Sequence, residues 1–472
     1  MLRLHGSRRT PTSRRISNLE RNYDDMPVKI GMVSLGCPKN QVDAEILMSR
    51  LSKEEGFTLS HDPALADVVI INTCGFIESA KQEAIDNILE YITLKKEGRI
   101  KKIIVTGCLA ERYRMEITGE MPEVDAVVGI GSNGEIADII RETLHDKKVY
   151  RFGEKCDLPL EGSRILGSLP FFAYLKIAEG CDNCCSYCAI PSIRGRFRSR
   201  PMESVLAEAK ELADEGVREL IVVAQDTTRY GQDLYGEYKL AALLRELAKI
   251  KEFKWIRVLY AYPERITDEL LEVIAENDNI AKYLDIPMQH CDAEILRAMN
   301  RPGDRAELEA LISHVREKVP GITLRTSLIA GFPGETQENF EHLCDFVKKA
   351  QFERLGCFAY SQEEGTVAGA MENQVDEQIR TDRAEMVMAE EMTIMDRQNQ
   401  EKIGSSILCV VEGFDRYGEC FFGRSEADAP DIDGKVFFTC KNRLSIGQFV
   451  TVEVEEVMDL DLIGVVTDEH PE

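Results

Sequence analysis

The chain has 472 residues, of which 44% are hydrophobic and 30% charged, so it is long enough to form two to four domains. Its formal net charge of −25 argues against a broad nucleic-acid-binding surface and favours a basic partner, although solubility alone would also explain the acidity. No apolar run reaches the roughly 18 residues of a membrane-spanning helix, and no secretory signal is visible.

Fourteen cysteines in such a chain fit a reducing cytoplasm, where clustered thiols indicate metal or redox chemistry. Residues 1–27 are predicted to be a disordered tail, because regular patterning begins only after Met26. A transit peptide or an upstream translation start would also explain this arginine-rich stretch.

Residues 28–145 alternate short apolar runs with amphipathic helical patterns. Strands are predicted at 29–36, 67–75, 101–107 and 125–131, and helices at 41–56 and 78–98. Alternation of this kind is typical of βαβ units and a parallel sheet. We therefore predict an N-terminal parallel α/β domain.

A cysteine follows or ends each of the first three of these strands, namely Cys37, Cys74 and Cys108. Ligands of open parallel sheets bind outside the carboxyl ends of the strands. The three thiols are therefore expected to converge on a ligand, although they are far apart along the chain. The alternative is that they are buried structural thiols, as free cysteines often are.

A charged linker is predicted at 146–166, and a second α/β series follows at 167–398. Its strands are predicted at 171–180, 219–226, 254–263, 283–290, 322–334 and 354–361. Helical patterns separate these strands, and a long acidic helix pattern at 375–404 closes the region. Six such units fall short of the eight of a full barrel, which indicates a partial, open one.

The remaining segment, 401–468, contains short strands separated by turns rich in Gly and Asp, which predicts a small β-barrel. From Glu401 to Glu472 there are 16 acidic and 6 basic residues, a net charge of −10. A basic protein partner would suit this segment better than a nucleic acid would.

The loop GCDNCCSYCAIP, which directly follows the first strand of the second series, holds four cysteines: Cys181, Cys184, Cys185 and Cys188. Three thiolates on a cubane iron–sulfur cluster leave one iron free to bind a substrate. The alternative is a closed four-cysteine zinc site, which normally uses two Cys-x2-Cys pairs on separate turns.

The spacing Cys181-x3-Cys185-x2-Cys188, with Tyr187 before the last cysteine, resembles the radical S-adenosylmethionine (SAM) superfamily. SLGCPKN, NTCGFIESAK and VTGCLAERY resemble the N-terminal domain of methylthiotransferases, and the C-terminal segment resembles a TRAM domain. The resemblance covers nearly everything after Met26. The first two motifs resemble the methylthiotransferases of ribosomal protein uS12 more than those that modify tRNA.

The resemblance implies two 4Fe-4S clusters, one held by Cys37, Cys74 and Cys108 and one by Cys181, Cys185 and Cys188. It also implies that SAM is used twice, once as a methyl donor and once as the source of a 5′-deoxyadenosyl radical. The implied target is the β-carbon of an aspartate in uS12, free or on the small subunit. An electron donor such as flavodoxin or ferredoxin would reduce the cluster, and no membrane is involved.

Three further residues at predicted strand ends are candidate SAM contacts. Gln225 and Asp226 end the second strand of the central series, and Gln289 ends the fourth. Each could instead cap its strand. Two other functions stay open, namely a tRNA methylthiotransferase and a two-cluster electron carrier or cluster scaffold without catalysis.

Overall fold

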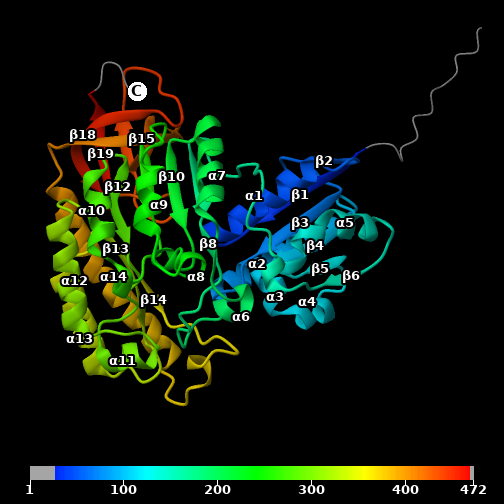
Figure 1. Ribbon diagram of the computed structural model, residues 1–472, viewed down its shortest axis with the longest axis horizontal. Coiled ribbons are helices and arrows are strands. Elements are labelled where there is room, and N and C mark those ends of the chain that lie inside the picture. The colour runs from blue at the N-terminus through cyan, green and yellow to red at the C-terminus, as the bar shows by residue number, and fades with distance from the viewer. Residues whose placement is uncertain (1–26, 468–472) are drawn as a thin grey trace, which may run out of the picture.

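The structure, a computed structural model, describes residues 27–467 and contains three units (Figure 1). An N-terminal unit built on one parallel sheet lies beside a central unit built on another, and a small β-barrel follows. The predicted fold class is confirmed. Nearly all of the predicted N-terminal tail lies outside the described residues, as does Asp468.

The N-terminal unit contains six strands, paired in parallel in the order β2-β1-β3-β4-β5-β6. Apolar side chains of α2 and α4 pack on one face of the sheet, and those of α1 and α5 pack on the other. Every residue of β3 is buried as a result. The elements are β1 (Val28–Ser34), α1 (Pro38–Ser52), β2 (Phe57–Leu59), η2 (Pro63–Leu65), β3 (Val68–Thr73), α2 (Glu78–Lys96), β4 (Lys102–Gly107), α3 (Cys108–Arg112), α4 (Arg114–Glu120), β5 (Ala126–Val128), η3 (Ile130–Glu135), α5 (Ile136–Leu144), β6 (Val149–Arg151) and η4 (Lys155–Asp157).

The two edge strands of this sheet were not predicted from the sequence. Strand β6 lies within the predicted linker at 146–166, so the N-terminal sheet extends to Arg151 and the connection begins after it. Strands β2 and β6 have three residues each, which is too short for a recognisable apolar period.

The central unit has six parallel strands in the order β14-β13-β12-β11-β10-β7, which form an open sheet. Its principal elements are β7 (Phe172–Lys176), α7 (Met202–Asp214), β10 (Glu219–Val223), α9 (Leu240–Leu247), β11 (Trp255–Val258), α10 (Asp268–Glu276), β12 (Ile280–Asp285), α12 (Arg305–Lys318), β13 (Thr323–Ala330), α13 (Gln337–Ala350), β14 (Arg354–Ala359) and α14 (Glu377–Gln400). The short elements are β8 (Ala178–Glu179), α6 (Ile190–Arg194), β9 (Arg198–Ser199), η5 (Thr227–Arg229), α8 (Gln232–Tyr235), η6 (Pro263–Arg265), α11 (Ala293–Ala298) and η7 (Ala368–Ala370).

The C-terminal unit is a closed barrel of β15 (Ser406–Asp415), β16 (Cys420–Ser425), β17 (Val436–Thr439), β18 (Phe449–Met458) and β19 (Asp461–Val466). It docks at the amino ends of the central strands. Arg424 pairs with Glu219 at 2.6 Å, and the ring of Phe449 meets Trp255 edge to face at 4.9 Å. The carboxyl ends of the central strands are therefore left open on the opposite side. Within 27–467, no helix combines the length and apolar character needed to cross a membrane.

Candidate functional site

A chamber of about 880 Å³ lies where the N-terminal unit meets the carboxyl ends of the central strands. Its size suits a drug-sized ligand. The chamber is lined by the six cysteines of the two predicted sets, by the spare cysteine and by both candidate glutamines. These residues are Cys37, Cys74, Cys108, Cys181, Cys184, Cys185, Cys188, Gln225 and Gln289. The chamber thus joins residues from three strand ends of one sheet with residues from a single loop of the other.

Glycines allow the first three thiols to approach one another. A Cβ on Gly36, whose φ is +89°, would lie 2.5 Å from the Cβ of Cys74. A Cβ on Gly75 would lie 2.8 Å from the Cα of Leu109, beside Cys108. A side chain at either position would push the strand ends apart. The structure therefore brings Cys37, Cys74 and Cys108 to one corner of the chamber.

Two of the three thiols of this corner, Cys74 and Cys108, are buried, and Cys37 is half-buried. Cys108 is 4% exposed, and Nη2 of Arg194 donates a hydrogen bond to its Sγ at 3.4 Å. Burial raises the pKa of the free Cys108 thiol to about 12, although Arg194 opposes the shift. Because metal ligands must be thiolates, a cluster that binds here must displace protons from these sulfurs.

The second set lies on the loop between β8 and α6, which backbone contacts hold in shape. The Cys181 N–H donates to the carbonyl of Gly195 at 3.1 Å, and the Cys188 N–H donates to that of Cys185 at 3.0 Å. Cys184 differs from its neighbours because it is exposed and has a φ of +53°. That Cys184 is the spare cysteine of the loop stays a prediction.

Each sulfur of the second set has a polar neighbour. Backbone N–H groups of Asn183 and Ile190 donate to Cys181 Sγ and Cys188 Sγ, each at 3.5 Å. The Cys185 Sγ and the Tyr262 hydroxyl lie 2.8 Å apart. Hydrogen bonds of this kind to sulfur tune iron–sulfur clusters. Burial raises the pKa of the free Cys181 thiol to about 11.

The donor set suits iron–sulfur chemistry. All the cysteines are free thiols, and each corner of the chamber offers soft sulfur ligands. Within 27–467, no group of three or more His, Cys, Asp or Glu side chains is arranged around a single metal ion. Two sets of three thiols could each hold a cluster that leaves one iron open.

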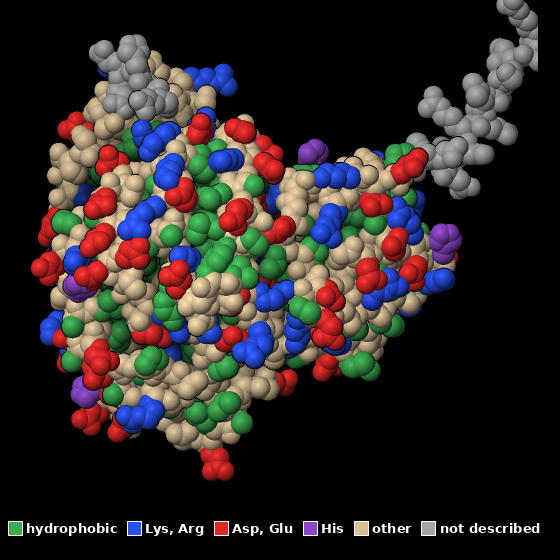
Figure 2. Space-filling view, in the orientation of Figure 1, with side chains coloured by type: hydrophobic (Ala, Val, Ile, Leu, Met, Phe, Trp, Pro, Cys, Tyr) green, Lys and Arg blue, Asp and Glu red, His purple; other side chains and the backbone are tan. Residues whose placement is uncertain are grey.

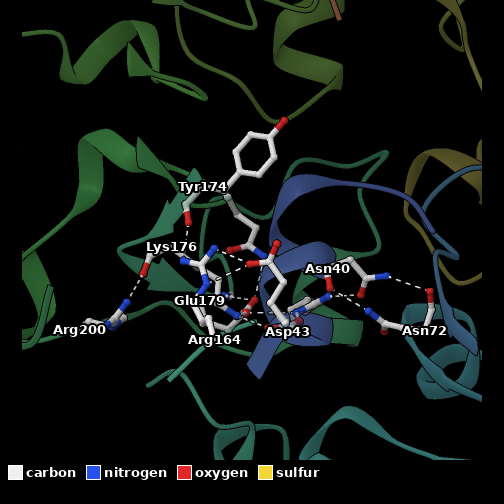
Figure 3. A network of polar contacts seen from close by, with 12 residues as sticks. Asn40, Asp43, Asn72, Arg164, Tyr174, Lys176, Glu179 and Arg200 are labelled. Atoms are coloured by element: carbon white, nitrogen blue, oxygen red, sulfur yellow. Dashed lines mark hydrogen bonds and ion pairs between the residues drawn. The ribbon is translucent and has the colours of Figure 1, made fainter. Parts of the chain in front are cut away.

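A buried polar network joins the N-terminal unit to the central unit (Figure 3). The guanidinium Nη1 of Arg194, from the central unit, pairs with Asp43 of α1 at 2.6 Å and with Glu179 at 3.1 Å. Lys176 also pairs with both carboxylates. Burial alone would raise the pKa of Glu179, but Lys176 and Arg194 hold it well below its usual range. The Arg194 side chain thus links Cys108 and Asp43 of the N-terminal unit to Glu179, which precedes the cysteine loop of the central unit.

The three candidate SAM contacts lie in different places. Gln225 and Gln289 line the chamber, and the side-chain oxygen of Gln225 is buried without a hydrogen-bond partner among the described residues. Asp226 is fully buried behind the loop, where it caps η5 and accepts hydrogen bonds from Asn183 and Arg265. Asp226 therefore supports the cysteine loop and does not line the chamber.

Several chamber residues were missed by the sequence reasoning. Tyr260 and Tyr262 follow β11, and Tyr260 has a φ of +62°, which is rare for a bulky residue. Lys39 and Arg301 add two cations to the lining. The available signals were YAYP at the end of a predicted strand and a lysine within SLGCPKN. Neither signal says that these side chains would meet.

Three family models match the chain. The uncharacterized protein family UPF0004 matches residues 29–129, the radical SAM superfamily matches 175–347, and the TRAM domain matches 403–467. These stretches correspond to the three units of the fold.

Relatives similar over nearly the full length are named ribosomal protein uS12 methylthiotransferase RimO. The chain is 49% identical over 438 residues to that of Desulforamulus reducens, covering 92% of this chain and 98% of the relative. It is 47% identical over 439 residues to that of Geobacter sulfurreducens, again covering 92% and 98%.

Solved structures share the fold at low sequence identity. The radical SAM methyltransferase TsrM from Kitasatospora setae, with tryptophan and a SAM analogue bound, superposes with a TM-score of 0.54 at 14% identity. That match covers 71% of this chain and 74% of the other. The cobalamin-dependent radical SAM enzyme OxsB in its apo form gives 0.50 at 14% identity, covering 78% and 57%.

Proposed function

This chain belongs to the ribosomal protein uS12 methylthiotransferases, a family of radical SAM enzymes, and we propose that it methylthiolates the β-carbon of an aspartate in uS12. The observation that carries this proposal is the single chamber lined by both cysteine sets. A reaction that activates a carbon and then delivers sulfur to it needs both centres to face the same space.

The target bond explains why two centres are needed. No side-chain base removes a proton from an unactivated C–H bond near neutral pH, so a hydrogen atom must be abstracted instead. When bound, the clusters and two SAM molecules would supply the 5′-deoxyadenosyl radical, the sulfur and the methyl group, with electrons from a donor such as flavodoxin or ferredoxin.

The chain's own residues would hold and shield these groups. Cys181, Cys185 and Cys188 would hold the cluster that binds SAM, and Cys37, Cys74 and Cys108 the other. Gln225 and Gln289, which line the chamber, would orient SAM. The enclosing walls would keep water from a reactive radical.

Modification of tRNA is the second candidate, and one surface feature favours it. On the acidic barrel, Phe414, Tyr417 and Phe437 lie with Arg416 and Lys435 around one shallow hollow, and Tyr417 is fully exposed. Aromatic side chains beside cations can stack on unpaired bases. However, acidic and basic side chains are interspersed on the face shown in Figure 2, without a basic stripe. Electrostatics therefore favour the basic protein uS12.

The decisive experiment compares cells with and without the gene. We expect mass spectrometry to show a mass increase of one methylthio group on an aspartate of uS12, and we expect deletion to remove it. The methylthio nucleosides of tRNA should not change. Loss of a methylthio group from tRNA alone would establish the second candidate.

Complementation of the deletion strain tests the cysteines of the site. Cys185→Ala should fail to restore the modified uS12, whereas Cys184→Ala, a change at the neighbouring exposed thiol, should restore it. The purified Cys37→Ala enzyme should still cleave SAM to deoxyadenosine without methylthiolation. Loss of activity in Cys184→Ala together with activity in Cys185→Ala would refute the assignment of the ligands.

A further inference from the structure

Lys39 places a buried ammonium in the chamber without a carboxylate partner. The residue is 8% exposed and lines the chamber, and its Nζ lies 3.5 Å from the centre of the Tyr260 ring. Among residues 27–467, no Asp or Glu forms an ion pair with it, in contrast to the buried Lys176. A buried cation is costly unless an anion or strong acceptors offset its lost hydration.

The surroundings of Lys39 add further positive charge. Lys39 belongs to the first turn of α1, where the helix dipole is positive, and that turn contains no acidic residue. The guanidinium of Arg194 lies at the same corner, bound to Cys108. Thiolate ligands of a bound cluster would balance part of this charge. The Lys39 ammonium lines the chamber, where an anionic ligand can reach it.

The other chamber cations are Arg194, Arg301 and Arg380, and each has partners that Lys39 lacks. Arg380 donates to the backbone carbonyls of Val375 and Tyr360. Arg194 is paired with Asp43 and Glu179. Arg301 donates to a backbone carbonyl and stacks over Tyr262, the residue in contact with Cys185 of the second set. Lys39 instead follows Cys37 of the first set by two positions. Lys39 thus adjoins the centre proposed to deliver sulfur, as Arg194 does, but unlike Arg194 it has no carboxylate partner among the described residues.

Tyr260, on which the ammonium rests, is held in a strained conformation. Its φ of +62° belongs to the left-handed region, and its N–H donates to Oδ2 of the buried Asp285 at 3.0 Å. Strain of this kind persists only where surrounding contacts impose it, and it is concentrated at functional sites. The ring therefore forms a fixed support for the Lys39 side chain from the opposite wall of the chamber.

We propose that Lys39 binds the carboxylate of the substrate aspartate and so selects an acidic target side chain. This inference rests on the proposed function. The β-carbon of aspartate is bonded directly to the carboxyl carbon. An ion pair at Lys39 would therefore place the reacting C–H bond beside the first cysteine set. An asparagine in the same position would leave the ammonium unpaired and would be rejected.

The test compares two substrates with two enzymes, all full-length and reconstituted with both clusters. The substrates are recombinant uS12 and a uS12 variant in which the modified aspartate is replaced by asparagine. We expect wild-type enzyme to prefer the aspartate protein at least about 20-fold in single-turnover methylthiolation. Lys39→Met should lower the rate with the aspartate protein about 100-fold and reduce the preference to about threefold or less.

Lys81→Met is the matched control. Lys81 also rests on a tyrosine ring, with Nζ 5.0 Å from the centre of Tyr113, but it has a carboxylate partner in Glu78. This variant should keep the wild-type preference. Iron content, the electron paramagnetic resonance spectra of both clusters and deoxyadenosine formation should be unchanged in Lys39→Met. Lys39→Gln provides a second variant should the methionine substitution impair folding.

The outcomes separate this inference from the function on which it rests. If wild-type enzyme modifies neither uS12 protein, the proposed function is wrong. If wild-type enzyme modifies uS12 but the Lys39 variants still prefer aspartate more than about tenfold, the role of Lys39 is refuted. Equal losses with both substrates, or altered cluster spectra, would show that Lys39 supports the cluster and does not bind the substrate.

Discussion

Burial changes the chemistry of single side chains in this protein, and Glu391 is a clear case outside the chamber. The residue lies on α14 with an exposure of 0%, and neither carboxylate oxygen has a hydrogen-bond partner among the described residues. Burial, with a smaller contribution from Glu353, raises its pKa to about 8, although Arg354 opposes the shift. Glu391 is therefore protonated in the folded protein at neutral pH.

A raised pKa in the folded state makes stability depend on pH. Because the folded protein binds the Glu391 proton more tightly than the unfolded chain does, its stability should fall as pH rises from about 5 to about 8. Glu391→Gln should remove this dependence and raise the free energy of unfolding at pH 9 by roughly 2–4 kcal/mol. Urea unfolding followed by the fluorescence of Trp255, the single tryptophan, measures the effect.

The exposed Glu385 on the same helix provides the control. Glu385→Gln should leave the pH dependence of unfolding as it is in the wild type. If Glu391→Gln unfolds with the wild-type pH dependence, Glu391 does not carry the buried proton.

At the scale of elements, the ends of β1, β3 and β4 bring three distant thiols together. Gly36 is central to this arrangement because it combines a positive φ with close contact to Cys74. Strand pairing sets the register of the sheet, with Ser34 opposite Asn72 and Thr73 opposite Gly107. The loops after these strands therefore emerge side by side.

Gly36→Ala should cost the protein its N-terminal cluster while sparing the other. The new methyl group would overlap the Cys74 side chain and displace the strand end. We expect iron analysis of reconstituted enzyme to fall from two clusters to one per chain, with deoxyadenosine formation retained.

Gly56→Ala is the matched control for Gly36→Ala. Gly56 has a similar φ of +86°, but no atom lies within 4 Å of the added Cβ. This variant should bind both clusters. Equal cluster loss in the two variants would mean that backbone strain, and not the contact with Cys74, explains the effect.

At the scale of the whole molecule, one buried ionic network joins the N-terminal and central units. Arg194 connects them through Asp43, Asn40 and Cys108 on one side and Glu179 on the other. Removing one partner of a buried ion pair leaves charges without compensation. The relative placement of the two cysteine sets therefore depends on this side chain.

Arg194→Met should destabilise the contact between the two units by roughly 3–5 kcal/mol. Hydrogen exchange of the amides in α1 and α6 should become faster, because these elements meet at the network. Arg245→Met, which breaks an exposed pair with Glu269, should change stability by about 1 kcal/mol or less. Unchanged exchange in Arg194→Met would show that apolar packing alone holds the units together.

Local patterns along the chain determined most of the secondary structure and the grouping of the cysteines on one loop. Apolar periods predicted the long strands and helices, because burial on a sheet or helix face repeats every few residues. The spacing of Cys181, Cys185 and Cys188 indicated their grouping, because one loop carries all three. Three-residue edge strands such as β6 escaped prediction since so short a run has no period.

Only the tertiary structure decided which distant side chains share the chamber. It separated Asp226, which is buried behind the cysteine loop, from its neighbour Gln225, which faces the chamber. It also placed Lys39 of the N-terminal unit against Tyr260 of the central unit. Contacts of this kind depend on how the two sheet-containing units pack against each other. No residue spacing within SLGCPKN, which holds Lys39, or within YAYP, which holds Tyr260, encodes that packing.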